Sequence, residues 1–258
     1  MEHANWAIRF LIFLLCASIL IRIWQARKGK KLFIRRLPGL DAIDEAVGRA
    51  TELGKPILFS LGLGGLNPTT FASMSVLRYV TTTAAKYGLR VIVPIFRPEV
   101  YPVVEDLMRE AYTVAGRPDL FSSDDIRFFS DQQSTWASAV AGTMERERPA
   151  ANFFFGEYGF ESLIIAETGR HIGAIQIAAT VSYYQIPFFI LACDYTLMGE
   201  ELYAASAYLS DNPVLRGSLV GQDLGKILIT LLIVLGSIGA TFATFKGIPN
   251  WILELLKY

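Results

Sequence analysis

The stretch "PILFSLGLGGLNPTT", residues 56–70, places an apolar run directly before a glycine-rich turn and a helix start. An apolar run of this length is typical of a strand that is buried on both faces. Asn67 and Pro68 are residue types that favour the cap and the first position of a helix. The stretch therefore predicts a strand, a tight turn and a helix, which is the repeating unit of a parallel α/β sheet.

The same alternation continues along the chain. Apolar runs predict strands at 56–62, 89–96, 126–130, 151–156 and 186–195. Helical periodicity predicts helices at 40–55, 67–88, 98–116, 134–148, 161–184 and 198–210. Right-handed crossovers between such strands give a doubly wound, mainly parallel five-stranded sheet of the Rossmann-like α/β class.

The composition is unusually apolar, because 52% of the 258 residues are hydrophobic. That share is high for an ordinary soluble domain. The 24 basic and 24 acidic side chains cancel, so no basic stripe indicates a nucleic-acid partner. The two cysteines, Cys16 and Cys193, suit neither a disulfide framework nor a zinc site, since both kinds of site need more ligands at closer spacing.

Both ends of the chain carry segments long enough to cross a membrane. Residues 6–24, "WAIRFLIFLLCASILIRIW", match the length of a spanning helix, and no cleavage site follows them as a signal peptide would require. Residues 224–245 form the second candidate, bordered by Lys226 and Lys246. The α/β domain is thus expected to be inserted between two transmembrane helices.

Basic residues set the expected topology. They follow the first apolar segment at Arg27, Lys28, Lys30, Lys31, Arg35 and Arg36. By the positive-inside rule, both termini lie outside and the α/β domain is cytoplasmic, in a multi-pass protein of the inner (cytoplasmic) membrane. The expected order is an N-terminal transmembrane helix (1–25), a basic juxtamembrane segment (26–38), a cytosolic α/β domain (39–222), a C-terminal transmembrane helix (223–246) and an interfacial amphipathic tail (247–258).

Small side chains recur every four residues in the second apolar segment, at Gly236, Ala240 and Thr244. A face of this kind lets another helix approach closely. We interpret it as an oligomer contact, or as a contact with the first helix. The alternative is that these residues merely face lipid.

Ligands of doubly wound sheets collect at the carboxyl ends of the strands. Gly62 and Gly64 match the start of a G-x-G-x-x-G fingerprint, but Asn67 replaces the third glycine and no lysine follows. We therefore interpret the segment as a turn, with nucleotide binding as the alternative. Candidate ligand-binding residues are Gly62, Gly64, Gly65, Asn67, Thr69, Arg97 and Glu99, where Glu99 would bind a ribose or Arg97 a 2′-phosphate.

Carboxylates supply the other candidates. Glu157 and Glu161 stand where a helix begins, so they offset its dipole or, with Asp194 after a predicted strand, act as catalytic acids. Glu167 and His171 share a helix face but lack a third ligand, so neither a metal nor another cofactor is expected.

The stretches "FFFGEYGFESLIIAETG" (153–169) and "ACDYTLMGEELYAASAYLS" (192–210) resemble an uncharacterised family of bacterial and archaeal membrane proteins. Members of that family pair a cytosolic α/β domain with membrane helices, and the likeness covers most of residues 37–230. The resemblance implies the architecture and carries no catalytic residue.

Three functions stay open. The first is a non-enzymatic, membrane-anchored scaffold that self-associates or joins other membrane subunits, using residues 236–244 and the apolar faces of residues 174–184 and 201–210. The second is a nucleotide or small-ligand sensor built on the glycine-rich turn. The third is an enzyme at the inner leaflet with a carboxylate site.

Overall fold

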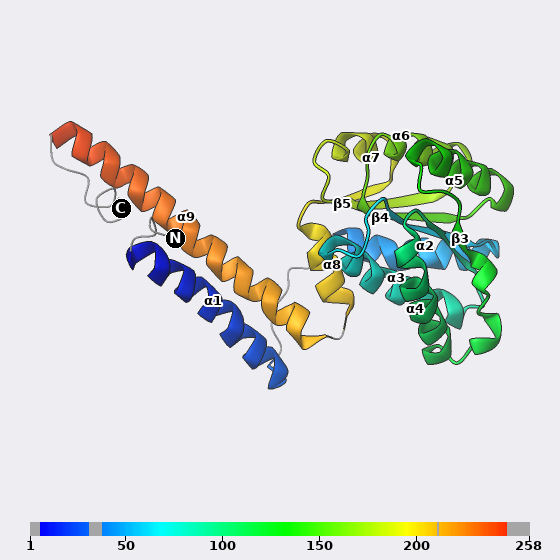
Figure 1. Ribbon diagram of the computed structural model, residues 1–258, viewed down its shortest axis with the longest axis horizontal. Helices are drawn as coiled ribbons and strands as arrows, with labels where there is room; N and C mark the ends of the chain where they lie inside the picture. The colour runs from blue at the N-terminus through cyan, green and yellow to red at the C-terminus, as the bar shows by residue number, and fades with distance from the viewer. Residues whose placement is uncertain (1–5, 31–37, 211, 247–258) are drawn as a thin grey trace. The chain divides into compact units, whose positions relative to one another are not determined.

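The computed structural model describes residues 6–30, 38–210 and 212–246 (Figure 1). The chain divides into two compact units, residues 35–210 and residues 1–34 with 211–258. The expected boundary at residue 222 falls inside the last helix, and the α/β unit ends at Ser210. The predicted tail 247–258, and residues 31–37 of the predicted basic segment, lie outside the described residues.

The α/β unit is built on one sheet. Its strands are β1 (Ile57–Gly62), β2 (Val91–Ile95), β3 (Ile126–Phe128), β4 (Ala151–Glu157), β5 (Ile175–Thr180) and β6 (Tyr195–Met198). Their order is β3-β2-β1-β4-β5-β6, and every neighbouring pair is parallel. The predicted Rossmann-like α/β fold is confirmed, with six strands instead of five.

Helices cover both faces of this sheet (Figure 1). They are α2 (Pro38–Leu53), α3 (Pro68–Lys86), α4 (Tyr101–Val114), α5 (Gln133–Glu147), α6 (Glu161–His171), α7 (Ile186–Ala192) and α8 (Glu201–Leu209). In Figure 1, α2, α3, α4 and α8 lie on one face, and α5, α6 and α7 on the other. Because successive strand residues point to opposite faces, Phe153 and Phe155 enter one core and Phe154 enters the other.

The prediction was wrong between residues 172 and 195. The helix expected over 161–184 ends at His171, and its second half is strand β5. The strand expected over 186–195 is instead helix α7, followed by β6. Gly173, with φ of 76°, turns the chain out of α6 in the left-handed conformation that commonly ends helices. The short apolar runs that follow suit a buried helix or a buried strand equally well.

The other unit contains helices α1 (Trp6–Arg27) and α9 (Pro213–Lys246), which pack antiparallel. Glycines of α9 make the contact: a Cβ on Gly217 would lie 2.5 Å from the Cα of Ile23, and one on Gly221 would lie 2.6 Å from the Cα of Ile19. One turn further, Gly225 meets the side chain of Leu15. The close helix contact is thus made by Gly217, Gly221 and Gly225.

The predicted small-residue face lies further along α9. Gly236 is eleven residues beyond Gly225, whereas α1 begins nine residues before Leu15, at Trp6. In the antiparallel register, Gly236, Ala240 and Thr244 therefore start past the described end of α1. Among the described residues, no contact between this face and α1 supports the hypothesis that the face packs against the first helix.

Both helices are long and apolar enough to cross a membrane. Their apolar stretches, Ile8–Arg27 and Pro213–Phe242, have mean hydropathies of 1.9 and 2.0 and are not buried inside the protein. A Ser18 hydroxyl, 3.5 Å from the Gly221 carbonyl oxygen, adds a polar contact between the helices, of the kind that joins helices in bilayers.

Candidate functional site

The carboxyl ends of β1 and β4 meet where the strand order reverses. From β1 the chain proceeds to β2 and β3 on one side, and from β4 it proceeds to β5 and β6 on the other. Crevices at such a switch point are where open α/β sheets bind ligands. The turn after β1 (residues 63–67) and the turn after β4 (residues 158–160) form this place, which we call the switch site.

The two strands approach each other closely at the switch site. Gly62 and Gly156 adopt φ values of 72° and 147°. A Cβ on Gly156 would collide with the Leu61 carbonyl oxygen, and one on Gly62 with the Glu157 carbonyl oxygen. The Leu63 amide also donates to the Glu157 carbonyl at 2.8 Å. The glycines are therefore required by backbone contact between the strands.

Asn67 joins the helix start to the neighbouring strand. Its side-chain oxygen accepts a hydrogen bond from the Thr70 amide at 2.9 Å, which confirms the predicted N-cap of α3. Its side-chain nitrogen donates to Glu157 Oε1 at 3.1 Å. Glu157 is the last residue of β4. The hydrogen bond from Asn67 therefore ties the carboxylate at the end of β4 to the turn that follows β1.

Glu161 is fully buried at the start of α6. Its Oε1 accepts the Gly159 amide at 2.8 Å, and its Oε2 accepts a hydrogen bond from the side-chain amide of Gln133 on α5. Beside it, the Tyr158 hydroxyl donates to the Ser60 carbonyl at 3.0 Å. Burial raises the pKa of Tyr158 well above its ordinary value, with a smaller contribution from the Glu161 charge, so the phenol stays protonated.

Hydrogen-bond donors remain open in the turn after β1. The amides of Gly64, Gly65 and Leu66 make no hydrogen bond with any residue that the structure describes. The Thr70 hydroxyl is buried without a partner among those residues, and it lies against Gly64. The carboxylate of Glu99 approaches the same turn at Gly65. The turn thus combines amides, a helix N-terminus and carboxylates.

Other predicted residues are used elsewhere. The Thr69 hydroxyl lies 2.9 Å from the Tyr203 hydroxyl of α8. The Arg97 guanidinium stacks over Phe96, 5.1 Å from the ring centre, and is exposed.

Cys193 and Asp194 precede β6 and do not follow a strand, as the sequence had suggested. In a parallel sheet this puts Asp194 at the amino edge, whereas Glu157 and Glu161 lie at the carboxyl edge. The three carboxylates therefore do not converge. Burial, and secondarily the Asp194 charge, raises the pKa of Cys193 far above its ordinary value, so its thiol is neutral.

Glu167 and His171 both lie on α6. Within residues 6–30, 38–210 and 212–246, no three His, Cys, Asp or Glu side chains gather so as to hold a metal ion.

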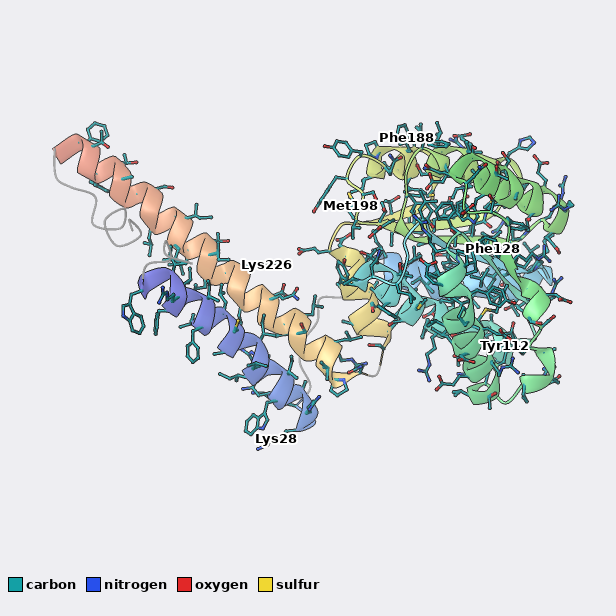
Figure 2. All side chains as sticks on the ribbon, in the orientation of Figure 1. Lys28, Tyr112, Phe128, Phe188, Met198 and Lys226 are labelled. Atoms are coloured by element: carbon teal, nitrogen blue, oxygen red, sulfur yellow. The ribbon has the colours of Figure 1, made fainter. Side chains whose placement is uncertain are left out.

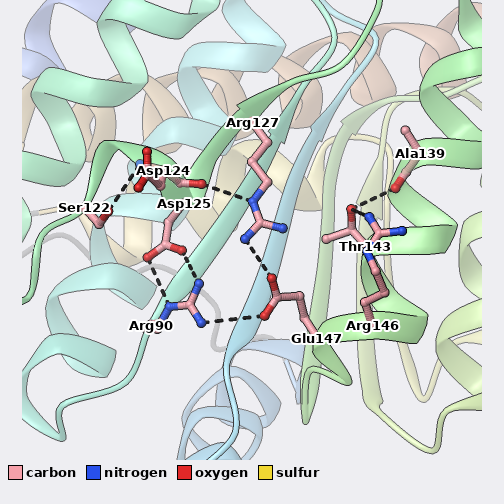
Figure 3. Close-up of polar contacts among 9 residues, drawn as sticks. All are labelled: Arg90, Ser122, Asp124, Asp125, Arg127, Ala139, Thr143, Arg146 and Glu147. Atoms are coloured by element: carbon pink, nitrogen blue, oxygen red, sulfur yellow. Dashed lines mark hydrogen bonds and ion pairs between the residues drawn. The ribbon is translucent and has the colours of Figure 1, made fainter.

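The β3 edge of the sheet carries an ion-pair network that sequence patterns do not reveal (Figure 3). Arg90 bonds Asp125 at 2.6 Å, and Arg127 bonds Glu147 at 2.7 Å. Arg90 also lies 3.6 Å from Glu147. The hydrogen bond from Arg127 lowers the pKa of Glu147. Charges of this kind protect an edge strand from pairing with another chain.

The β6 edge is different. No charged residue occurs from Ile172 to Cys193, yet large side chains there are exposed. The β6 edge surface consists of Tyr183, Tyr184, Phe188, Ile190, Leu191, Tyr195 and Met198. Tyr184 is 90% exposed and Leu191 is 67% exposed. Figure 2 shows Phe188 and Met198 at one end of the α/β unit and Phe128 of β3 nearer the other.

These features define a class of protein: a Rossmann-like α/β domain between two apolar helices that could each span a membrane. The chain matches, over residues 1–250, the family described as a domain of unknown function (DUF6754), and it belongs to that family. The expected membership of an uncharacterised family is thereby confirmed. No curated protein and no solved structure matches the chain.

Proposed function

We propose that this protein is a non-enzymatic membrane scaffold. Helices α1 and α9 anchor it in the bilayer, and the α/β domain binds another copy through the β6 edge surface. The observation that carries the proposal is the exposure of seven large aromatic and aliphatic side chains, five of which lie in the charge-free stretch 172–193. Contiguous exposed apolar surface of this kind marks interaction sites.

The two sheet edges support a second copy as the partner. Edge strands offer unpaired main-chain groups, and proteins usually block them with charge. The β3 edge carries this ion-pair network, whereas the four side chains of β6 itself are uncharged and only its last amide, that of Met198, is bonded by a carboxylate, that of Glu201 at 3.0 Å. Tyrosine is common in protein interfaces, and three of the seven side chains are tyrosines.

The orientation in the membrane belongs to the same proposal. We place both termini outside and the α/β domain in the cytoplasm of a cell with an inner membrane, because Lys and Arg follow the first helix. The antiparallel packing of α1 and α9 supports both termini lying on the same side, since two spanning helices that flank one domain must run in opposite directions; the choice of side rests on the basic residues alone.

The test is the mass of the purified particle in mild detergent, corrected for bound detergent. We expect a discrete multiple of 28.6 kDa. Replacing Tyr184 and Phe188 together by glutamate should reduce it to the monomer, because burying two charges without partners is unfavourable. The matched control is Val114→Glu on α4, which is 64% exposed and should leave the mass unchanged. A wild-type monomer would contradict the proposal.

The predicted face on α9 is tested separately. If Gly236 and Ala240 contribute to the assembly, replacing both by leucine should lower the mass as well. An unchanged mass would limit the contact to the α/β domain.

A second candidate function, a ligand sensor, is favoured by the Thr70 hydroxyl and the open amides at the switch site. A helix N-terminus with free amides suits a phosphate, and Glu99 would bind a ribose hydroxyl. Millimolar nucleotide should then raise the melting temperature, and Thr70→Val should abolish the rise, whereas Thr70→Ser should keep it. Equal melting across a nucleotide panel would argue against this function.

A further inference from the structure

A groove of about 520 Å³ opens at the amino edge of the sheet, away from the switch site. It lies between the C-terminal parts of α2, α6 and α7, the first residues of β5, and Cys193 and Asp194, which precede β6. Its volume is in the range of small-molecule sites. Its charged lining residues are Arg49, Arg170 and Asp194.

These three charges do not neutralise one another. Arg49 makes no hydrogen bond or ion pair with any described residue. Arg170 donates one N–H to the Leu191 carbonyl at 3.3 Å and keeps its other donors. Asp194 accepts the Gln176 amide at 2.7 Å through Oδ2, and it forms no ion pair with either arginine. The groove therefore presents two guanidinium groups and one carboxylate to a ligand.

The surroundings restrict the charge of that ligand. Three helices end near the groove, and helix C-termini carry partial negative charge. Together with Asp194, they oppose a ligand that carries only negative charge. Guanidinium groups bind carboxylates and phosphates well, while a carboxylate such as Asp194 binds an ammonium group.

We propose that this groove binds a small zwitterion, a molecule that joins an ammonium group to a carboxylate or phosphate. Arg49 and Arg170 hold the oxyanion, and Asp194 holds the ammonium group. The proposed binding is non-covalent: desolvation raises the pKa of the half-buried Cys193 thiol beside Asp194, so this thiol is neutral and does not serve as a nucleophile. The same chemistry occurs in a free phosphoethanolamine and in the headgroup of an ethanolamine phospholipid.

The experiment measures the melting temperature of the full-length protein in detergent with millimolar O-phosphoethanolamine. At ten times the Kd, the melting temperature should rise by roughly 3 to 6 °C. Inorganic phosphate or ethanolamine alone should raise it less. No rise with O-phosphoethanolamine, or an equal rise with phosphate alone, would overturn the proposal.

Substitutions in the groove test which residues bind the oxyanion of the ligand and which binds its ammonium group. Arg49→Gln and Arg170→Gln should each remove most of the rise. Asp194→Asn keeps an oxygen for the Gln176 amide but should abolish the preference for O-phosphoethanolamine over phosphate. Arg146→Gln, an exposed arginine of α5, is the matched control and should behave as wild type. If the groove variants keep the full rise and preference, the ligand binds elsewhere and the proposal fails.

Two further experiments identify the source of the ligand and distinguish a failure of this proposal from a failure of the proposed self-assembly. Nanodiscs of phosphatidylethanolamine should stabilise the wild type more than phosphatidylcholine nanodiscs if a lipid headgroup occupies the groove, whereas a free ligand gives no such difference. The Tyr184→Glu, Phe188→Glu variant should still bind O-phosphoethanolamine. Loss of assembly and loss of zwitterion binding are thus distinguishable.

Discussion

Replacing Gly156 by alanine is expected to unfold the α/β domain at temperatures where the wild-type chain stays folded. The residue has a φ of 147°, a backbone conformation that residues with a Cβ rarely adopt. The new Cβ would also collide with the Leu61 carbonyl oxygen of β1. Strand β1 is buried along its whole length and cannot move aside. We expect a loss of about 4 kcal/mol, a large fraction of the stability of an ordinary domain.

Thermal unfolding followed by circular dichroism measures this effect. Gly48→Ala is the matched control, because its Cβ would meet open space on helix α2. That change should stabilise the domain by about 0.5 to 1 kcal/mol, since alanine favours helix. Equal melting of the Gly156→Ala variant and wild type would show that the β1–β4 contact is looser than described.

Replacing Gly221 by leucine is expected to separate α1 from α9. Its Cβ would already lie 2.6 Å from the Cα of Ile19, and the rest of the leucine side chain needs still more room. Small residues let helix backbones approach closely, and the van der Waals packing that results is one of the forces that hold helices together in a bilayer. The variant should therefore lose the pairing while the α/β domain stays folded.

Disulfide cross-linking checks this result. Leu15 and Gly225 are replaced by cysteine, since they lie opposite each other, and Cys16 is replaced by alanine. After proteolysis of the α/β domain, oxidation should link the two helices in most molecules, and adding Gly221→Leu should abolish the link. Ser237→Leu, an exposed position of α9, is the control. A link that persists with Gly221→Leu would contradict the predicted contact.

Local signals account for the parts of the fold that the sequence predicts. Asn67 and Pro68 mark the start of α3 because a cap depends on residues within one turn. Between residues 172 and 195, by contrast, the chain has no charged residue before Asp194 and therefore little polar periodicity. Helix and strand cannot be distinguished there from pattern alone, and the structure has both.

The contacts of the switch site are not visible in the sequence. Asn67 and Glu157 are 90 positions apart, and Gln133 and Glu161 are 28 apart. The sequence could place the carboxylates at turns, but it could not show which amides would hold them. Assigning Asp194 to the same edge failed because it depended on the type of one short apolar run.

The glycines of α9 have a consequence for how α1 and α9 register against each other. Gly217, Gly221 and Gly225 repeat every four residues, which is about 6 Å along a helix. A shift of α1 by that length moves Ile19 from one glycine to the next and restores the same type of contact. The glycine repeat therefore determines which faces of α1 and α9 pack together, but it permits several axial positions of one helix along the other.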